Sequence, residues 1–238
     1  MNRKPPDDEA RAVQARYARR AAADMRYSLF DPTALRAWQE RQRAVLRRLA
    51  REGMTDLPAL RLLDVGCGSG GNLLDCLRMG FVPEHLAGIE LLAERFQAAR
   101  ACLPAAVDLR QGDATAVDLP AAGFDIVSQL TVFSSLLDDA FQQRLADAMW
   151  AWVRPGGGIL WYDFTVNNPR NADVRGVPLA RVRALFPQGR ISAERLTLAP
   201  PIARAVNRIH PLLGGALGSI PLLRTHVLVW VEKPSAAS

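Results

Sequence analysis

Short apolar runs alternate with longer helix-like segments from residue 60 onward. The runs that read as strands cover residues 60–65, 86–89, 107–109, 124–129, 158–164, 191–198 and 225–231. Between the first five runs, apolar spacing predicts helices near residues 71–79, 92–102 and 138–153. Near-continuous apolar strands that alternate with helices are typical of a parallel sheet with both faces covered. We therefore expect an α/β fold with a seven-stranded, mostly parallel sheet.

The segment before residue 60 has a helical pattern. Residues 1–10 are expected to be a frayed tail, and the Ala- and Arg-rich residues 11–23 favour a helix. A second helix is expected from Thr33 to Arg51, because its apolar residues recur mostly at helical spacing. Gly53 would end this helix.

Residues 199–224 interrupt the alternation of strands and helices. They are rich in proline and glycine, and residues 211–223 carry no charge. The segment is too short and too broken to span a bilayer. Three interpretations stay open: an insertion that covers the core, a lid, and a surface that meets lipid.

The net charge of +6 is concentrated near the N-terminus. Residues 1–61 hold 14 basic and 8 acidic residues, and the rest of the chain is neutral. Arginine side chains bind phosphate and carboxylate groups well, but a solvated helix face also explains the surplus of basic residues in this segment. An interaction with RNA would rest on this charge alone, so a nucleic-acid partner is disfavoured. Three cysteines do not form a disulfide framework, and no secretory signal is visible, so we expect a cytoplasmic protein.

A glycine-rich loop gives the strongest chemical signal. The sequence Leu-Leu-Asp-Val-Gly-Cys-Gly-Ser-Gly-Gly-Asn covers residues 62–72, so an apolar strand leads directly into the loop. Loops of this kind approach phosphate groups in dinucleotide sites. Here Asp64 places a carboxylate beside the loop, which disfavours phosphate and favours a ligand that carries a cation. A tight strand–helix turn is the plain structural explanation for the glycines.

Over about residues 60–165 the sequence resembles class I S-adenosylmethionine-dependent methyltransferases, which have a Rossmann-like sheet. The glycine loop matches the first motif of that family. Glu90 stands where the family keeps an acid for the ribose hydroxyls, and Asp113 stands where it binds the adenine amino group. Residues 124–129 and 154–158 resemble the fourth strand and the turn into the fifth. S-adenosylmethionine is therefore the expected cofactor.

The resemblance implies a set of cofactor-binding residues and a division of the chain. We expect residues 1–56 to form a tail and a helical cap over the cofactor cleft. Residues 57–238 would form the cofactor-binding domain, with the insertion 199–224 before the last strand. The expected cofactor-binding residues are Asp64, Gly66, Cys67, Gly68, Gly70, Asn72, Glu90, Leu91, Asp113, Ala114, Gln129 and Phe133.

Acceptor residues are expected at the carboxyl ends of the strands, where open α/β sheets bind ligands. Asp163 is a candidate general base or a loop cap, and His210 is a candidate base or a structural residue. His85 and His226 begin predicted strands, which would place them at the opposite edge, so they are left out. The residues expected to contact the acceptor are Tyr27, Tyr162, Asn167, Asn168 and Arg170.

The acceptor class is narrowed mainly by absences. Residues 128–133 lack the Asn/Asp-Pro-Pro-aromatic motif of base N-methyltransferases, and no His/Cys group has metal-ligand spacing. We expect methyl transfer to a hydroxyl of a small molecule or saccharide, including a lipid-linked one at the inner membrane face. Four stretches (88–95, 131–135, 161–169 and 222–226) resemble uncharacterised bacterial methyltransferases related to polysaccharide and glycolipid assembly.

Two alternatives to this acceptor stay open. One is methylation of a soluble metabolite at oxygen or nitrogen, with residues 199–224 as a closed lid. The other is a non-catalytic regulatory protein that binds S-adenosylmethionine. The oligomeric state has no signal in the sequence.

Overall fold

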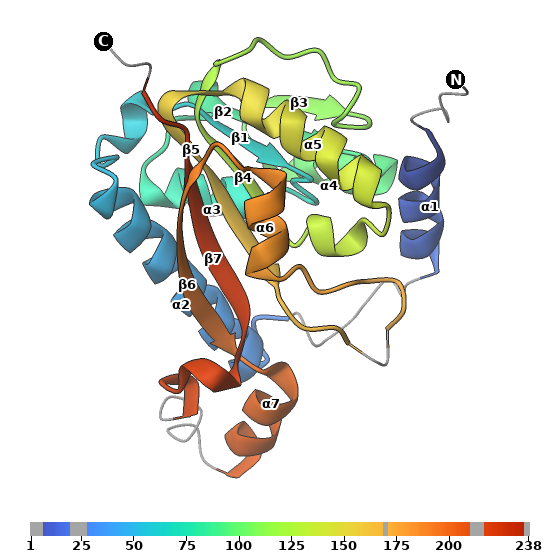
Figure 1. Ribbon diagram of the computed structural model, residues 1–238, viewed down its shortest axis with the longest axis vertical. Coiled ribbons are helices and arrows are strands. Elements are labelled where there is room, and N and C mark those ends of the chain that lie inside the picture. The colour runs from blue at the N-terminus through green and yellow to red at the C-terminus, as the bar shows by residue number, and fades with distance from the viewer. Residues whose placement is uncertain (1–6, 20–27, 169–170, 210–216, 236–238) are drawn as a thin grey trace.

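The computed structural model describes residues 7–19, 28–168, 171–209 and 217–235. Its centre is a seven-stranded sheet with the order β3-β2-β1-β4-β5-β7-β6 (Figure 1). The expected α/β fold is therefore confirmed. The strands are β1 (Leu62–Val65), β2 (Leu86–Glu90), β3 (Asp108–Gln111), β4 (Phe124–Leu130), β5 (Val153–Phe164), β6 (Arg190–Leu198) and β7 (Arg224–Glu232).

The direction of the last strand differs from the others. Strands β1 to β5 pair in parallel, whereas β7 pairs antiparallel with both β5 and β6. The start of β7 therefore lies at the edge where the parallel strands end, because Phe164 near the end of β5 pairs with His226. The expectation that His226 lies at the far edge is wrong for this reason.

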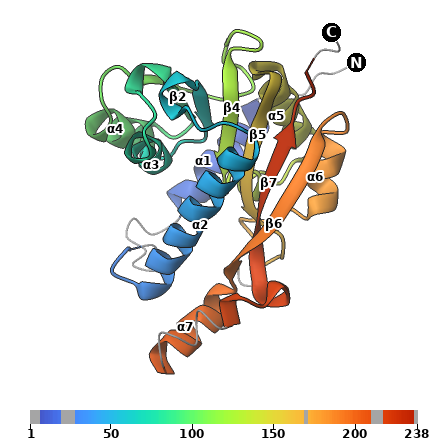
Figure 2. The ribbon, with the colours of Figure 1, turned by 90° about the vertical axis from the view of Figure 1, so that its left-hand side faces the viewer.

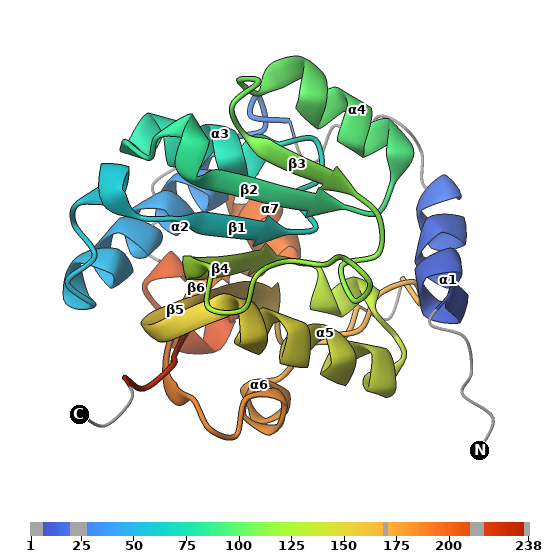
Figure 3. The ribbon, with the colours of Figure 1, turned by 90° about the horizontal axis from the view of Figure 1, so that it is seen from above.

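Helices cover both faces of the sheet (Figure 3). One face packs against α2 (Pro32–Arg51), α3 (Gly71–Met79) and α4 (Ala93–Cys102) through a core that includes Leu49, Leu73 and Ala99. The other face packs against α5 (Asp139–Trp152) and α6 (Leu179–Leu185) through Met149 and Val182. Helices thus cover the two faces of the sheet and leave the ends of its strands accessible to ligands.

The two N-terminal helices have different positions. Helix α1 (Asp7–Ala18) lies beside the carboxyl ends of β1, β2 and β3 (Figure 3). Helix α2 instead packs on the sheet, because its apolar side chains Ala44 and Leu49 are buried in the core. Residues 7–10 belong to α1, so the frayed tail expected over residues 1–10 is too long.

The insertion before β7 contains a helix that the sequence did not predict. Helix α7 (Pro200–Ile209) packs against α2 and lies at the lower end of the molecule (Figures 1 and 2). Its two leading prolines suggest a broken segment, yet proline is well tolerated in the first turn of a helix. Helix α6 was also missed, because it has only seven residues.

Candidate cofactor and acceptor site

The glycine loop turns sharply between β1 and α3. Gly66, Gly68 and Gly70 have φ angles of 67°, 57° and 86°, a left-handed region that favours glycine. A Cβ atom on Gly66 would lie 2.6 Å from Cγ2 of Val132, so the loop packs tightly against the segment after β4. A Cβ atom on Gly68 would meet nothing within 4 Å. The loop is thus closed on one side and open on the other, where a ligand can lie.

Glu90, at the end of β2, is fixed beside this loop. Its Oε2 accepts a hydrogen bond of 2.8 Å from the Gly68 amide, and its Oε1 accepts one of 2.8 Å from the Leu92 amide. The residue is buried, with 5% of its surface exposed. Each carboxylate oxygen can accept a further bond, so the group remains able to bind two hydroxyls.

Asp113 follows β3 and faces the same region. Its Oδ1 accepts hydrogen bonds from the Thr115 amide at 2.8 Å and the Thr115 hydroxyl at 2.9 Å. These bonds hold the side chain in one orientation and leave Oδ2 available to an amine donor.

Glu90 and Asp113 line a common cavity of about 120 Å³. Small-molecule sites are commonly about 300–1,000 Å³, so this cavity suits one part of a ligand. Its walls come from β1, β2, β4, the segments after β3 and β4, and helices α1, α4 and α5. The lining residues are Val13, Tyr17, Val65, Gly66, Ile89, Glu90, Leu91, Leu92, Arg95, Gly112, Asp113, Ala114, Leu130, Thr131, Val132, Ser135, Leu136, Phe141 and Leu145.

Asp64 is buried in β1 on the face that packs against α2 and α3. Its Oδ1 accepts a hydrogen bond of 2.7 Å from the Ser128 hydroxyl. Burial raises its pKa to about 7, while hydrogen bonds from Ser128 and Asn72 and the charge of Arg41 partly oppose this shift. A cation beside the loop would favour the ionised carboxylate. Asp64 and Asn72 are thus in contact beside the glycine loop.

Three expected cofactor residues turn their side chains into the protein. Phe133 is fully buried, and its ring centroid lies 4.3 Å from that of Trp161. Gln129 is fully buried and accepts a hydrogen bond of 2.9 Å from the Val132 amide. Cys67 is buried, and its thiol sulfur lies 2.9 Å from the position that a Cβ on Gly88 would take. The side chains of Phe133 and Gln129 therefore pack beneath the segment after β4, and contact of these two residues with the cofactor stays a prediction.

Asp163 is not exposed at the acceptor edge. Its Oδ2 accepts a hydrogen bond of 3.0 Å from the Ser134 amide, and its Oδ1 accepts one of 2.9 Å from the Phe164 amide. The side chain has no exposed surface, and burial raises its pKa to about 7. The structure does not favour the general-base expectation, because Asp163 is buried and accepts its hydrogen bonds from the backbone of Phe164 and of Ser134 in the short helix η4 (Phe133–Ser135).

The other residues expected to contact the acceptor differ in burial, and some lie outside the described residues. The buried Tyr162 donates or accepts a 2.8 Å hydrogen bond with the Thr197 hydroxyl, and burial raises its pKa to about 12. Asn167 and Asn168 are exposed, and Asn167 Oδ1 accepts a 2.9 Å bond from the Gly176 amide. This bond ties Asn167 to Gly176, nine residues later in the chain. Tyr27, Arg170 and His210 lie outside the described residues.

His226 is a candidate that the sequence reasoning excluded. Its imidazole stacks on Tyr162 with ring centroids 5.1 Å apart, and its Nδ1 is 3.1 Å from the Thr225 hydroxyl. Burial and the charge of Arg41 lower the pKa of His226 to about 4, so the ring is neutral near pH 7. The Arg41 guanidinium lies 5.5 Å from the Tyr162 ring centre, which adds a cation to this edge. His226 lies here because β7 runs antiparallel to β5 and β6, and this direction depends on long-range pairing that the sequence pattern does not show.

Comparison with known proteins agrees with this geometry. Residues 62–157 match a family model described as a methyltransferase domain. The matched residues contain the glycine loop, Glu90 and Asp113. A curated relative, indolepyruvate C-methyltransferase of Streptomyces griseus, is 34% identical over 90 residues.

The match to this relative is partial, covering 35% of this chain and 27% of the relative's length. A methyltransferase structure from Archaeoglobus fulgidus has a TM-score of 0.58 and 16% identity, with 84% of this chain and 98% of that chain covered. Phosphoethanolamine N-methyltransferase 2 of Haemonchus contortus, solved with S-adenosylhomocysteine, has a TM-score of 0.60 and 15% identity, with 94% and 60% covered. These structures show that the methyltransferase fold extends beyond residues 62–157.

The described residues contain neither a cluster of metal ligands nor a membrane-spanning helix. No three His, Cys, Asp or Glu side chains in this part of the chain come together as metal ligands. No helix among the described residues has the length and hydropathy needed to cross a membrane.

Proposed function

We propose that the protein is an S-adenosylmethionine-dependent methyltransferase that acts on a hydroxyl of a small molecule or saccharide. The observation that carries the proposal is the position of Glu90 between the glycine loop and the cavity that Asp113 lines. When bound, S-adenosylmethionine supplies a methyl group on a sulfonium ion, which needs no acid to leave.

The residues of this chain would act mainly by positioning. Glu90 would accept hydrogen bonds from the ribose hydroxyls, and Asp113 Oδ2 would accept one from the adenine amine. Asp64 would favour an ammonium group beside the loop once its carboxyl is ionised. Holding the methyl donor and the acceptor in a reactive geometry is worth many orders of magnitude in rate, so these contacts are the main contribution.

The acceptor would lie over the carboxyl ends of β4 and β5 and the start of β7. Arg41, Tyr162 and His226 meet near this edge. His226 replaces Asp163 as the candidate base, because its ring is neutral and its Nδ1 already faces Thr225, which leaves Nε2 for the acceptor. The lowered pKa makes this imidazole a weak base, so positioning remains the larger effect.

Exposed apolar side chains support a lipid-linked acceptor. Phe30 and Leu222 are 94% and 90% exposed, in the segments that precede α2 and β7. Figure 2 shows the beginnings of these two elements at the same end as α7. Residues 195–231 contain four arginines and no acidic residue. Apolar side chains beside positive charge fit an anionic membrane surface.

Vesicle flotation tests the membrane part of the proposal. The protein should float with vesicles that contain anionic phospholipid, and less with purely zwitterionic vesicles. The variant Phe30→Ser with Leu222→Ser should float less than the wild type. Absence of flotation with anionic vesicles at low salt would restrict the acceptor to soluble molecules.

The main test combines binding and turnover. Titration calorimetry should detect binding of S-adenosylmethionine and S-adenosylhomocysteine. A coupled assay for S-adenosylhomocysteine should then show turnover with pools of saccharides and other hydroxyl compounds, with amine and carbon-acid pools as comparisons. Turnover only with amines or carbon acids would refute the hydroxyl acceptor, and binding without turnover on any pool would favour a regulatory protein.

A further inference from the structure

Helix α1 forms a wall of the cofactor cavity. Val13 and Tyr17 line the cavity together with Glu90 and Asp113. The Tyr17 ring also lies under Arg95, whose guanidinium carbon is 4.4 Å from the ring centre. Because Arg95 is another lining residue, α1 meets both the cavity and α4 at this place.

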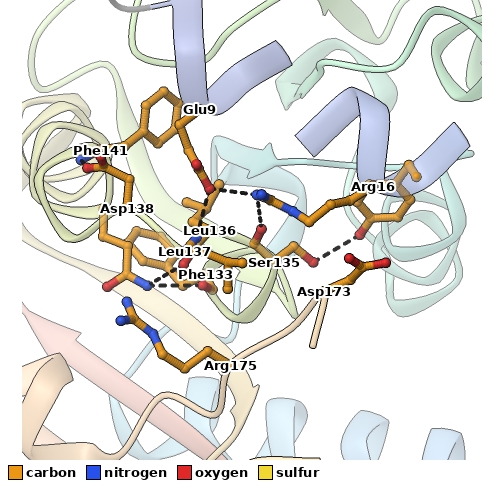
Figure 4. Close-up of polar contacts among 12 residues, drawn as sticks. Glu9, Arg16, Phe133, Ser135, Leu136, Leu137, Asp138, Phe141, Asp173 and Arg175 are labelled. Atoms are coloured by element: carbon orange, nitrogen blue, oxygen red, sulfur yellow. Dashed lines mark hydrogen bonds and ion pairs between the residues drawn. The ribbon is translucent and has the colours of Figure 1, made fainter. Parts of the chain in front are cut away.

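A set of polar contacts holds α1 on the segment after β4 (Figure 4). Arg16 Nη2 donates hydrogen bonds to Glu9 Oε1 at 2.6 Å and to the Ser135 carbonyl at 2.9 Å. The Leu137 amide donates to the same Glu9 oxygen at 2.7 Å. The Tyr17 and Ser135 hydroxyls are 3.1 Å apart. The Glu9–Arg16 pair is largely shielded from water, with side-chain exposures of 12% and 10%.

Two of the residues that hold α1, Tyr17 and Ser135, also line the cavity. Ser135 lies in the wall, and Leu136 next to it does so too. A change in the docking of α1 therefore acts on two walls at once: on Tyr17 directly and on Ser135 through its hydrogen bonds.

The docked position of α1 depends on these contacts. The helix has 12 residues, a length at which an isolated helix is marginal in water. Val13 and Ala10 are its buried apolar residues, and both are small. The buried Glu9–Arg16 pair is therefore a principal part of what fixes the helix over the cavity.

We propose that α1 completes the cofactor site, with Tyr17 contacting the adenosyl group and the Glu9–Arg16 pair positioning the helix. This inference rests on the proposed function, because it assigns the adenosyl group to the cavity. The cavity suits such an assignment: Glu90 and Asp113 offer acceptors for hydroxyl and amine donors, and Tyr17 and Leu91 offer apolar surface. Tyr17 is a binding residue in this proposal, and Glu9 and Arg16 are positioning residues.

Calorimetric titration with S-adenosylhomocysteine tests the proposal on four full-length variants. Tyr17→Ala should weaken binding about fivefold to 100-fold, the range found when a stacked aromatic ring is removed. Tyr17→Phe keeps the ring and should restore most of the affinity. Glu9→Ala should also weaken binding, although Glu9 does not line the cavity. Gln14→Ala, an exposed position on the same helix, should leave binding unchanged.

Hydrogen exchange of the wild type gives a second measurement that needs no variant. S-adenosylhomocysteine should slow the exchange of amides in α1 and in residues 133–138. Equal affinities of Tyr17→Ala, Glu9→Ala and wild type, or unchanged exchange in α1, would overturn this inference while the proposed function stood. Failure of the wild type to bind would reject both.

Discussion

Replacement of Glu90 by alanine should affect both stability and cofactor binding. The Glu90 carboxylate accepts two hydrogen bonds of 2.8 Å, one from the Gly68 amide in the glycine loop and one from the Leu92 amide after β2. The substitution would therefore remove support from the loop as well as a contact to the ligand.

The size of each effect follows from the contacts. An unsatisfied buried donor costs about 1–3 kcal/mol. Gly68 and Leu92 are both half-buried, so water can reach their amides and the lower end of the range applies. Two donors then give about 2 kcal/mol of lost unfolding free energy. For the ligand, two hydrogen bonds to a charged group at about 1.5 kcal/mol each predict a loss of affinity greater than about 100-fold.

Two assays separate these effects. Urea unfolding would measure the free energy of unfolding, and calorimetric titration with S-adenosylhomocysteine would measure the affinity. Glu90→Gln retains one acceptor oxygen and should fall between alanine and wild type in both. Glu94→Ala, which removes an exposed carboxylate from the first turn of α4, serves as a control and should match the wild type.

The reasoning would fail if Glu90→Ala unfolded like the wild type, because the two backbone bonds would then contribute nothing. Unchanged affinity for S-adenosylhomocysteine in a folded Glu90→Ala protein would remove the ribose assignment. A large loss of stability with unchanged affinity would make Glu90 purely structural.

Three further predictions concern the loop and the core behind it. Because burial raises the pKa of Asp64 to about 7 and an ammonium group favours its ionised form, S-adenosylhomocysteine should bind more weakly as the pH falls below that value. The limit is about tenfold per pH unit, and calorimetry of Asp64→Asn should show a flatter profile. Gly66→Ala should cost at least about 1–2 kcal/mol in urea unfolding, because φ is 67° and Val132 blocks the new methyl group. Phe133→Ala should cost about 3–5 kcal/mol in the same assay, and a loss below 1 kcal/mol would contradict its position against Trp161.

Much of the fold could be predicted from the sequence, because the signals are local. The apolar runs identified all seven strands, and the glycines at 66, 68 and 70 marked the strand–helix turn. The positions of Glu90 and Asp113 at strand ends followed from the parallel order of β1, β2 and β3. These features depend on residues close together in the chain.

The acceptor side could not be predicted, because it depends on long-range pairing. The direction of β7 is set by hydrogen bonds to β5 and β6, and it decides on which edge His226 lies. The burial of Asp163 and Phe133 depends on how the segment after β4 folds back onto β5. The contact between α1 and Ser135 joins residues more than a hundred positions apart. No local pattern encodes such contacts.

The reversed strand also determines where the protein is best attached to a support. Because β7 runs against β5, Glu232 at its end pairs with Gly158, at the edge of the sheet away from the cavity. Helix α1 lies instead beside the cavity. An affinity tag or fluorophore on the C-terminal side of the chain would therefore follow the strand end that is away from the cavity, whereas one on the N-terminal side would precede the helix that lines it.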